Sequence, residues 1–204
     1  MAEQSNEPQQ QRSREKVARI LAATAALLEN TPYQEIGTKL IAAEAGVSVG
    51  ILYRYFADRE AIVAALLHTW LQADLATVER LAAGPLPADR REFLATVFAA
   101  YADRFRTVPG YRQLWYHGPR IAAVQAESKE TDARIAEHVH RALVTGYALP
   151  DTPDSLRRTH LAVSVASHLL DLAFCADRDG DPAVLADAAL MLELYLFAPA
   201  AASS

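Results

Sequence analysis

The segment from Thr38 to Glu60 holds the residues whose types and spacing could do chemistry. Within it, Gly46-Val47-Ser48-Val49-Gly50 fits the G-x-S-x-G pattern with which α/β-hydrolases present a nucleophilic serine. That arrangement needs a buried strand before the serine, and an acidic residue and a histidine after it. The residues before Gly46 are instead rich in Ala and Glu and lack a β-branched run. A serine hydrolase is therefore the weaker interpretation, and we expect no catalytic residue here.

The same segment fits a helix-turn-helix unit, in which two short helices meet at a tight turn. Apolar residues keep helical spacing from Leu40 to Ala45, and Gly46 is the residue type that commonly ends a helix in a left-handed conformation. Ser48 can accept a backbone N–H bond at the start of the next helix, which continues to Phe56. The sequence thus predicts one short helix on each side of this turn.

This stretch resembles the DNA-binding region of the TetR family of transcriptional repressors. The matching residues are Ile41-Ala42, Glu44-Ala45-Gly46-Val47-Ser48, Gly50, Leu52-Tyr53, Tyr55-Phe56 and Asp58-Arg59-Glu60. Gly37 and Ile51 depart from the pattern, because family members usually carry hydroxyl residues there. The resemblance implies that contacts with operator DNA come from Thr38, Lys39, Ser48, Val49, Gly50, Tyr53, Tyr55 and Arg59.

Composition bounds the remaining possibilities. The chain has 204 residues, of which 51% are apolar and 22% charged, as in ordinary globular proteins. Its single cysteine, Cys175, excludes an internal disulfide and a multi-cysteine metal site, and fits a cytoplasmic protein. The longest uncharged apolar run, residues 61–73, is shorter than the ~20 residues of a membrane span. We expect a soluble protein without cofactor or metal.

Basic residues are outnumbered by acidic ones, 20 to 25, but several of them cluster near the N-terminus. The net charge is −5, so a DNA-binding interpretation depends on where the positive charges lie. Four of them gather at the first helix and three fall within or beside the helix-turn-helix, namely Arg12, Arg14, Lys16, Arg19, Lys39, Arg54 and Arg59. This clustering can build a positive face for phosphates, although solvated surface charge explains the first four equally well.

Helical periodicity with Pro and Gly breaks predicts an all-α protein of about nine helices. We expect a disordered N-terminal arm over residues 1–11 and a first helix from Arg14 to Asn30. Residues 12–60 are expected to form a three-helix DNA-binding domain. Residues 61–204 are expected to form a larger helical bundle for effector binding and dimerisation.

The last two predicted helices carry apolar residues on more than one side. They lie within Ser155–Asp177 and Pro182–Phe197. A helix that is apolar on two sides must bury both, and the resemblance identifies the second partner as another copy of the chain. A homodimer would read a pseudo-palindromic operator. Charge substitutions at Leu192 or Leu196 are expected to dissociate it.

The resemblance further implies a pocket for a small-molecule effector that releases the operator. Candidate residues are aromatic or polar side chains of the C-terminal region: Trp70, Phe98, Tyr101, Phe105, Trp115, Tyr116 and Phe174, with His68, His117, His168 and Cys175. Many apolar walls and few charges favour an uncharged or weakly acidic ligand. Ordinary core packing is the alternative for each aromatic. The function expected is a ligand-responsive homodimeric repressor, with a helical interaction module without DNA binding as a further alternative.

Overall fold

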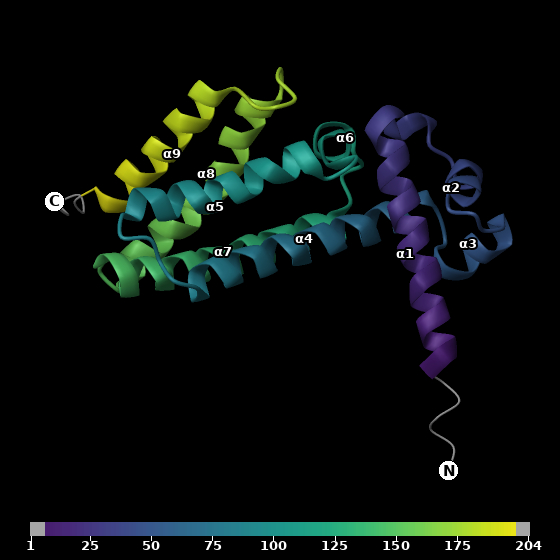
Figure 1. Ribbon diagram of the computed structural model, residues 1–204, viewed down its shortest axis with the longest axis horizontal. Coiled ribbons are helices and arrows are strands. Elements are labelled where there is room, and N and C mark those ends of the chain that lie inside the picture. The colour runs from purple at the N-terminus through teal and green to yellow at the C-terminus, as the bar shows by residue number, and fades with distance from the viewer. Residues whose placement is uncertain (1–6, 199–204) are drawn as a thin grey trace, which may run out of the picture. The chain divides into compact units, whose positions relative to one another are not determined.

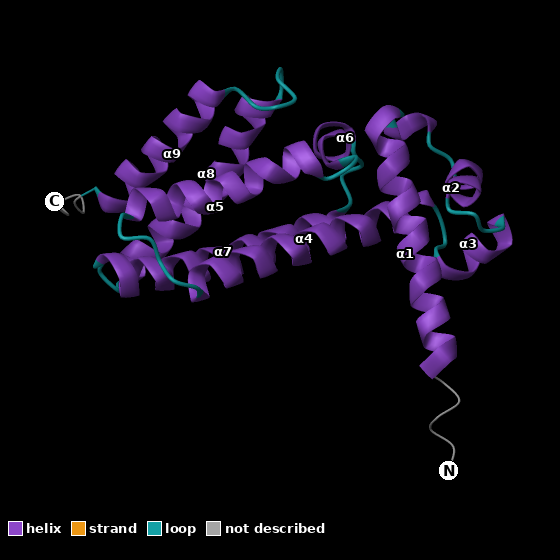
Figure 2. Cartoon of the chain, in the orientation of Figure 1, coloured by secondary structure: helices purple, strands orange, loops and turns teal. Residues whose placement is uncertain are grey.

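The computed structural model describes residues 7–198, which form nine α-helices, one 3₁₀ helix and no strand (Figures 1 and 2). This confirms the predicted all-α class. The elements are α1 (Glu7–Asn30), η1 (Tyr33–Glu35), α2 (Thr38–Glu44), α3 (Val49–Tyr55), α4 (Arg59–Ala83), α5 (Arg90–Thr107), α6 (Tyr111–His117), α7 (Ala122–Tyr147), α8 (Pro153–Phe174) and α9 (Pro182–Phe197).

Two helix starts follow directly from the sequence. The Thr152 side chain accepts the Ser155 amide in a reciprocal capping box before α8. The Asp181 carboxylate accepts the Ala183 and Val184 amides before α9. Both helices also begin with proline, which fits the first turn because its missing N–H has no partner there.

The predicted arm is wrong for residues 7–11, which belong to α1. The helix starts seven residues before Arg14, because Gln and Glu are good helix formers even without an apolar period. A hydrogen bond of 3.1 Å from Gln11 Nε2 to Glu15 Oε1, one turn later, supports this extension. Residues 1–6 lie outside the described residues.

The chain divides into two compact units. The first comprises residues up to Trp70 together with Val108–Gln125, and its core includes Ile20, Ile41 and Leu52, each fully buried. The second comprises Leu71–Thr107 and residues from Ala126 onward. Its core is formed by α4, α5, α7, α8 and α9 around residues such as Phe93 and Leu143. The functional boundary expected at residue 60 remains a proposal, since these units are defined by packing alone.

Helix α4 is the one helix within residues 7–198 that has the length and apolar content of a membrane span. Its apolar residues are packed, however, with Ile62, Val63 and Val78 at most 1% exposed. It also carries Asp74, whose Oδ1 lies 2.7 Å from Arg104 Nε of α5. These are the properties of a core helix in a globular bundle.

Candidate functional site

The turn between α2 and α3 has the geometry that its sequence predicts. Gly46 has φ of 63°, in the left-handed region that glycine adopts without strain. The Gly46 and Val47 amides donate to the Ala43 and Ala42 carbonyls at 3.1 and 3.0 Å, which closes α2. The Ser48 hydroxyl then accepts the Ile51 amide at 3.2 Å and caps α3. A helix, not a strand, precedes this serine, so the structure does not support a hydrolase elbow.

Two tyrosine hydroxyls are held by neighbouring helices. The Thr38 Oγ1 of α2 lies 3.1 Å from the Tyr53 hydroxyl of α3. Tyr53 is nevertheless 51% exposed. The Ser13 hydroxyl of α1 donates to the Tyr55 hydroxyl at 3.2 Å. Each hydrogen bond restricts the direction of a polar group at the end of a long side chain, so α3 presents oriented hydroxyls.

Arg59, the first residue of α4, is bound to the chain before α2. Its Nη1 donates to the Tyr33 and Ile36 carbonyls at 3.0 Å and to the Gln34 carbonyl at 3.4 Å. The guanidinium also lies over the Tyr33 ring, 4.1 Å from its centroid. These bonds explain a cation in the first turn of a helix, where the helix dipole disfavours it. Arg59 therefore positions η1, and its contact with a DNA phosphate stays a prediction.

Several basic side chains remain available to an external anion. Arg12, Arg14 and Arg19 of α1, Lys39 of α2 and Arg54 of α3 are exposed. Within residues 10–198, none of these five side chains forms an ion pair. Positive charge that no carboxylate neutralises, beside oriented hydroxyls and the start of a short helix, suits contact with a phosphate backbone.

Comparisons with known proteins agree with this geometry. The family model described as "Bacterial regulatory proteins, tetR family" matches residues 20–66. The model described as "Tetracyclin repressor-like, C-terminal domain" matches residues 88–200. The chain belongs to the TetR family. Chains of this family are DNA-binding transcriptional regulators, and regulators of this type are soluble proteins that act in the bacterial cytoplasm.

Curated relatives match this TetR-family chain over 82 residues. An uncharacterized HTH-type transcriptional regulator of Mycobacterium tuberculosis is 38% identical, over 40% of this chain and 42% of that protein. The HTH-type transcriptional repressor KstR of the same organism is 35% identical, over 40% of this chain and 37% of that protein. The matched part thus spans less than half the length of these relatives.

Solved structures share the whole fold. A TetR-family transcriptional regulator from Streptomyces coelicolor is 28% identical, with a TM-score of 0.67, covering 89% of this chain and 97% of that one. The regulator FadR from Bacillus subtilis, solved with stearoyl-CoA, has a TM-score of 0.68 and covers 88% of this chain and 97% of its own. Because this FadR shares only 17% sequence identity with the chain, its similarity supports the fold and nothing further.

Helices α8 and α9 of this TetR-family regulator carry most of its exposed large apolar side chains. Of the ten in the described residues, seven lie on this pair: Leu161, Val165, Leu172, Leu190, Met191, Leu194 and Tyr195. We call these seven residues the α8/α9 face. Leu192 and Leu196 do not belong to it, because both pack into their own bundle and Leu196 is only 4% exposed. A charge at either would therefore disturb the protomer itself, so they are unsuitable for testing an interface.

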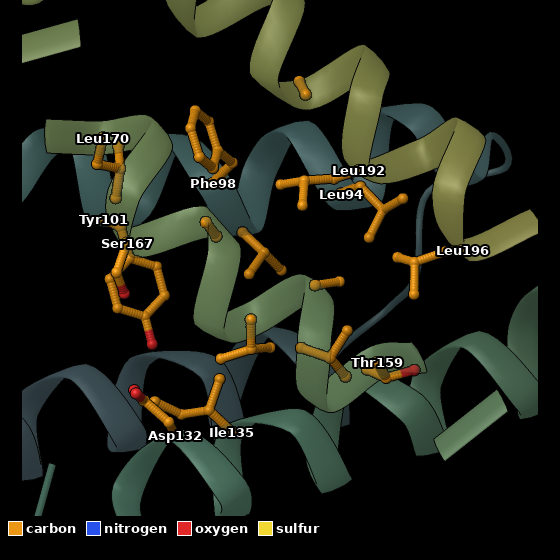
Figure 3. Close-up of a pocket in the computed structure, with 16 residues that line it drawn as sticks. Leu94, Phe98, Tyr101, Asp132, Ile135, Thr159, Ser167, Leu170, Leu192 and Leu196 are labelled. Carbon is orange, nitrogen blue, oxygen red and sulfur yellow. The ribbon is translucent and has the colours of Figure 1, made fainter. Parts of the chain in front are cut away.

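The second unit contains a cavity of about 70 Å³ between α5, α7, α8 and α9 (Figure 3). Its walls are mostly apolar, and its polar side chains are Tyr101, Asp132, Thr159 and Ser167. Figure 3 shows Asp132 and Tyr101 at one end and Leu196 at the other. Burial raises the pKa of Asp132 from 3.8 to about 6.

Only two of the aromatic residues proposed from the sequence as ligand contacts, Phe98 and Tyr101, line this cavity. Phe105 and Phe174 stack with their ring centroids 4.8 Å apart and are buried in the second unit. The His168 side chain is 85% exposed. The ligand role of all these residues stays a prediction.

Apart from Cys175, which is exposed in the second unit, the other proposed ligand residues, His68 among them, belong to the first unit. Trp70 and Trp115 flank Tyr111, with ring centroids 5.1 and 5.9 Å from its ring. Tyr116 and His117 are at the end of α6, also in the first unit. Sequence reasoning missed Asp132 because it lies in the charged stretch from Glu127 to Arg134. A signal was available, because Asp132 shares a helical stripe with Ile135 and Val139.

Proposed function

We propose that this TetR-family chain is a homodimeric repressor that binds a pseudo-palindromic operator and is released by a small, largely apolar ligand. Residues 12–60 would bind DNA, and residues 61–204 would bind the effector and the second copy. The observation that carries the proposal is the oriented hydroxyl set of α3, beside unpaired basic side chains.

Phosphate contacts follow from the Thr38 and Tyr53 hydroxyls. Two hydroxyl groups carry two protons, and the bond between them uses one. The other proton is free to bond a phosphate oxygen, which is an acceptor only. Lys39, next along α2 and exposed, adds a positive charge at the same helix start. Contacts of this kind set the register of a protein on the duplex without reading its sequence.

Base contacts are proposed at the start of α3. Ser48 is its cap, and Val49 and Gly50 are its first two residues. Small side chains there let the helix approach base edges closely, and Val49 offers an apolar contact to a thymine methyl. Direct readout by these residues is limited, so we expect a short half-site whose recognition depends strongly on phosphate contacts.

The α8/α9 face supports dimerisation. Contiguous exposed apolar patches on soluble proteins commonly mark interaction sites. Two helix-turn-helix units must also lie about 34–36 Å apart to enter successive turns of the major groove, so a second copy meets both needs. The cavity is lined in part by the same two helices, so a ligand bound there contacts the pair that carries the α8/α9 face. Such a ligand lowers operator affinity only to the extent that it binds the DNA-free state more tightly than the DNA-bound state.

Stoichiometry on DNA tests this proposal. The measurement is sedimentation of the protein with a duplex that carries two selected half-sites, and with one in which a half-site is scrambled. We expect two protomers on the full site and at least tenfold weaker binding to the scrambled one. One protomer on the full site, or equal affinity for both duplexes, would contradict the homodimeric repressor.

A further inference from the structure

The cavity of the second unit contains a carboxylate, that of Asp132, which no side chain in the described part of the chain neutralises. Within residues 10–198, Asp132 has no hydrogen-bond or ion-pair partner. Two arginines on the lining helices pair with other carboxylates: Arg104 of α5 with Asp74 at 2.7 Å, and Arg134 of α7 with Glu79 at 3.4 Å. An unpaired charge that is partly removed from water lowers the stability of the folded state. If the protein did not use this carboxylate, a neutral residue at position 132 would be the more stable choice.

We propose that this cavity binds a compact apolar molecule that carries a protonated amine, with the amine at Asp132. The inference rests on the proposed ligand response, whose ligand class it specifies. It departs from the uncharged or weakly acidic ligand expected from the sequence, since that expectation did not include Asp132.

The apolar walls define the body of the ligand. Three different helices contribute Phe98, Ile135 and Leu192, among others, and give the cavity no second charge (Figure 3). Its volume of about 70 Å³ compares with about 150 Å³ for an engineered cavity that holds benzene. At less than half that volume, the cavity accepts a single small ring or a short branched chain only when lining side chains move apart.

The polar end of the cavity determines which ligand charge it prefers. Because burial raises the pKa of Asp132 only to about 6, this carboxyl is ionised at pH 7.5. A ligand ammonium group would pair with it in surroundings of low dielectric constant, whereas a ligand carboxylate would be repelled. The hydroxyls of Tyr101 and Ser167 line the same cavity, and their oxygens can accept hydrogen bonds from the remaining N–H groups of the ammonium.

The test uses three probes with one ring and different polar groups: cyclohexylamine, cyclohexanol and cyclohexanecarboxylate. Calorimetric titration at pH 7.5 measures their binding to the wild type, to Asp132→Asn and to the control Asp187→Asn. Asp187 is an exposed acidic residue of α9 outside the cavity lining. We expect the amine to bind the wild type at least tenfold more tightly than the carboxylate. Asp132→Asn should remove that preference, and Asp187→Asn should keep it.

Equal amine affinity in the wild type and Asp132→Asn would overturn the inference, as would tighter binding of the carboxylate to the wild type. Ala166→Leu, which fills the cavity, provides a second check, with circular dichroism to confirm folding. Amine binding that survives this folded variant places the ligand elsewhere and also overturns it.

Operator affinity in the presence of each probe separates this inference from the proposed function. Amine binding that depends on Asp132 but leaves operator affinity unchanged supports the site and contradicts ligand release. Release of DNA by cyclohexanol or the carboxylate, equally from the wild type and Asp132→Asn, supports ligand release and overturns the amine site.

Discussion

The Thr38 and Tyr53 hydroxyl oxygens lie 3.1 Å apart, so the first residue of α2 is joined to an exposed tyrosine of α3. The bond links the two helices of the helix-turn-helix through the groups proposed to bind phosphate. It also restricts the Tyr53 side chain before DNA arrives, and an ordered side chain loses less entropy on binding.

Tyr53→Phe should weaken binding to operator and to random DNA by a similar factor. The loss of one hydrogen bond to a phosphate corresponds to about 1 kcal/mol, or roughly fivefold in affinity. Fluorescence anisotropy with labelled duplexes measures both affinities. Tyr116→Phe, at the end of α6, is the matched control and should change neither. Unchanged affinities in Tyr53→Phe would remove this tyrosine from the interface.

Gly46→Ala should destabilise the protein, whereas Gly37→Ala should not. An added Cβ meets no atom within 4 Å at either position. Only Gly46 has a positive φ, where a side chain costs about 1–2 kcal/mol, while Gly37 has φ of −101°. Urea denaturation of the two variants compares the free energies of unfolding. Equal stabilities would show that the backbone of this turn relaxes.

Leu194→Glu should convert the proposed dimer to monomers. Leu194 is 56% exposed in the protomer and belongs to the α8/α9 face, so a charge there is tolerated by the fold but not by an apolar interface. Light scattering at micromolar concentration measures the mass. Ala95→Glu, on an exposed position of α5, is the control and should remain dimeric. A monomeric wild type would be incompatible with the interface.

Asp132→Asn should stabilise the protein above pH 6 and lose this advantage in acid. The folded pKa of about 6 exceeds the unfolded value of 3.8, so the folded state binds more protons between these values and stability falls as pH rises. The isosteric amide removes that cost, which we set at about 1–2 kcal/mol after allowing for screening by solvent. Urea denaturation of the variant and the wild type at pH 7.5 and at pH 4 measures the difference in their free energies of unfolding above and below the folded pKa. A pH-independent difference would contradict the burial of this carboxyl.

Local signals explain why so much of the fold was predictable. Gly46 and Ser48 define the turn and the cap of α3 through groups within a few residues of them, and Thr152 and Asp181 do the same for α8 and α9. The start of α1 was missed because Gln10 and Gln11 give no apolar period.

The cavity could not be predicted, because it forms where helices far apart in the sequence pack together. A single sequence does not reveal that packing. Phe98 lies on it, whereas Phe105, two turns later on α5, is buried against Phe174 of α8. Residue type alone does not distinguish these two phenylalanines. Arg59 illustrates the same limit, because its bonds to the Tyr33 and Ile36 carbonyls follow from the tertiary structure and not from the helix that it begins.

The central claim is that the helix-turn-helix reads DNA, and selection from random duplexes tests it most directly. Purified protein retains fragments from a random pool over several rounds, and the retained fragments are sequenced. The account predicts one enriched motif with two inverted half-sites about one helical turn apart, centre to centre. It also predicts that Tyr53→Phe enriches the same motif more weakly. Retained DNA without a common motif, or no retained DNA, would contradict it.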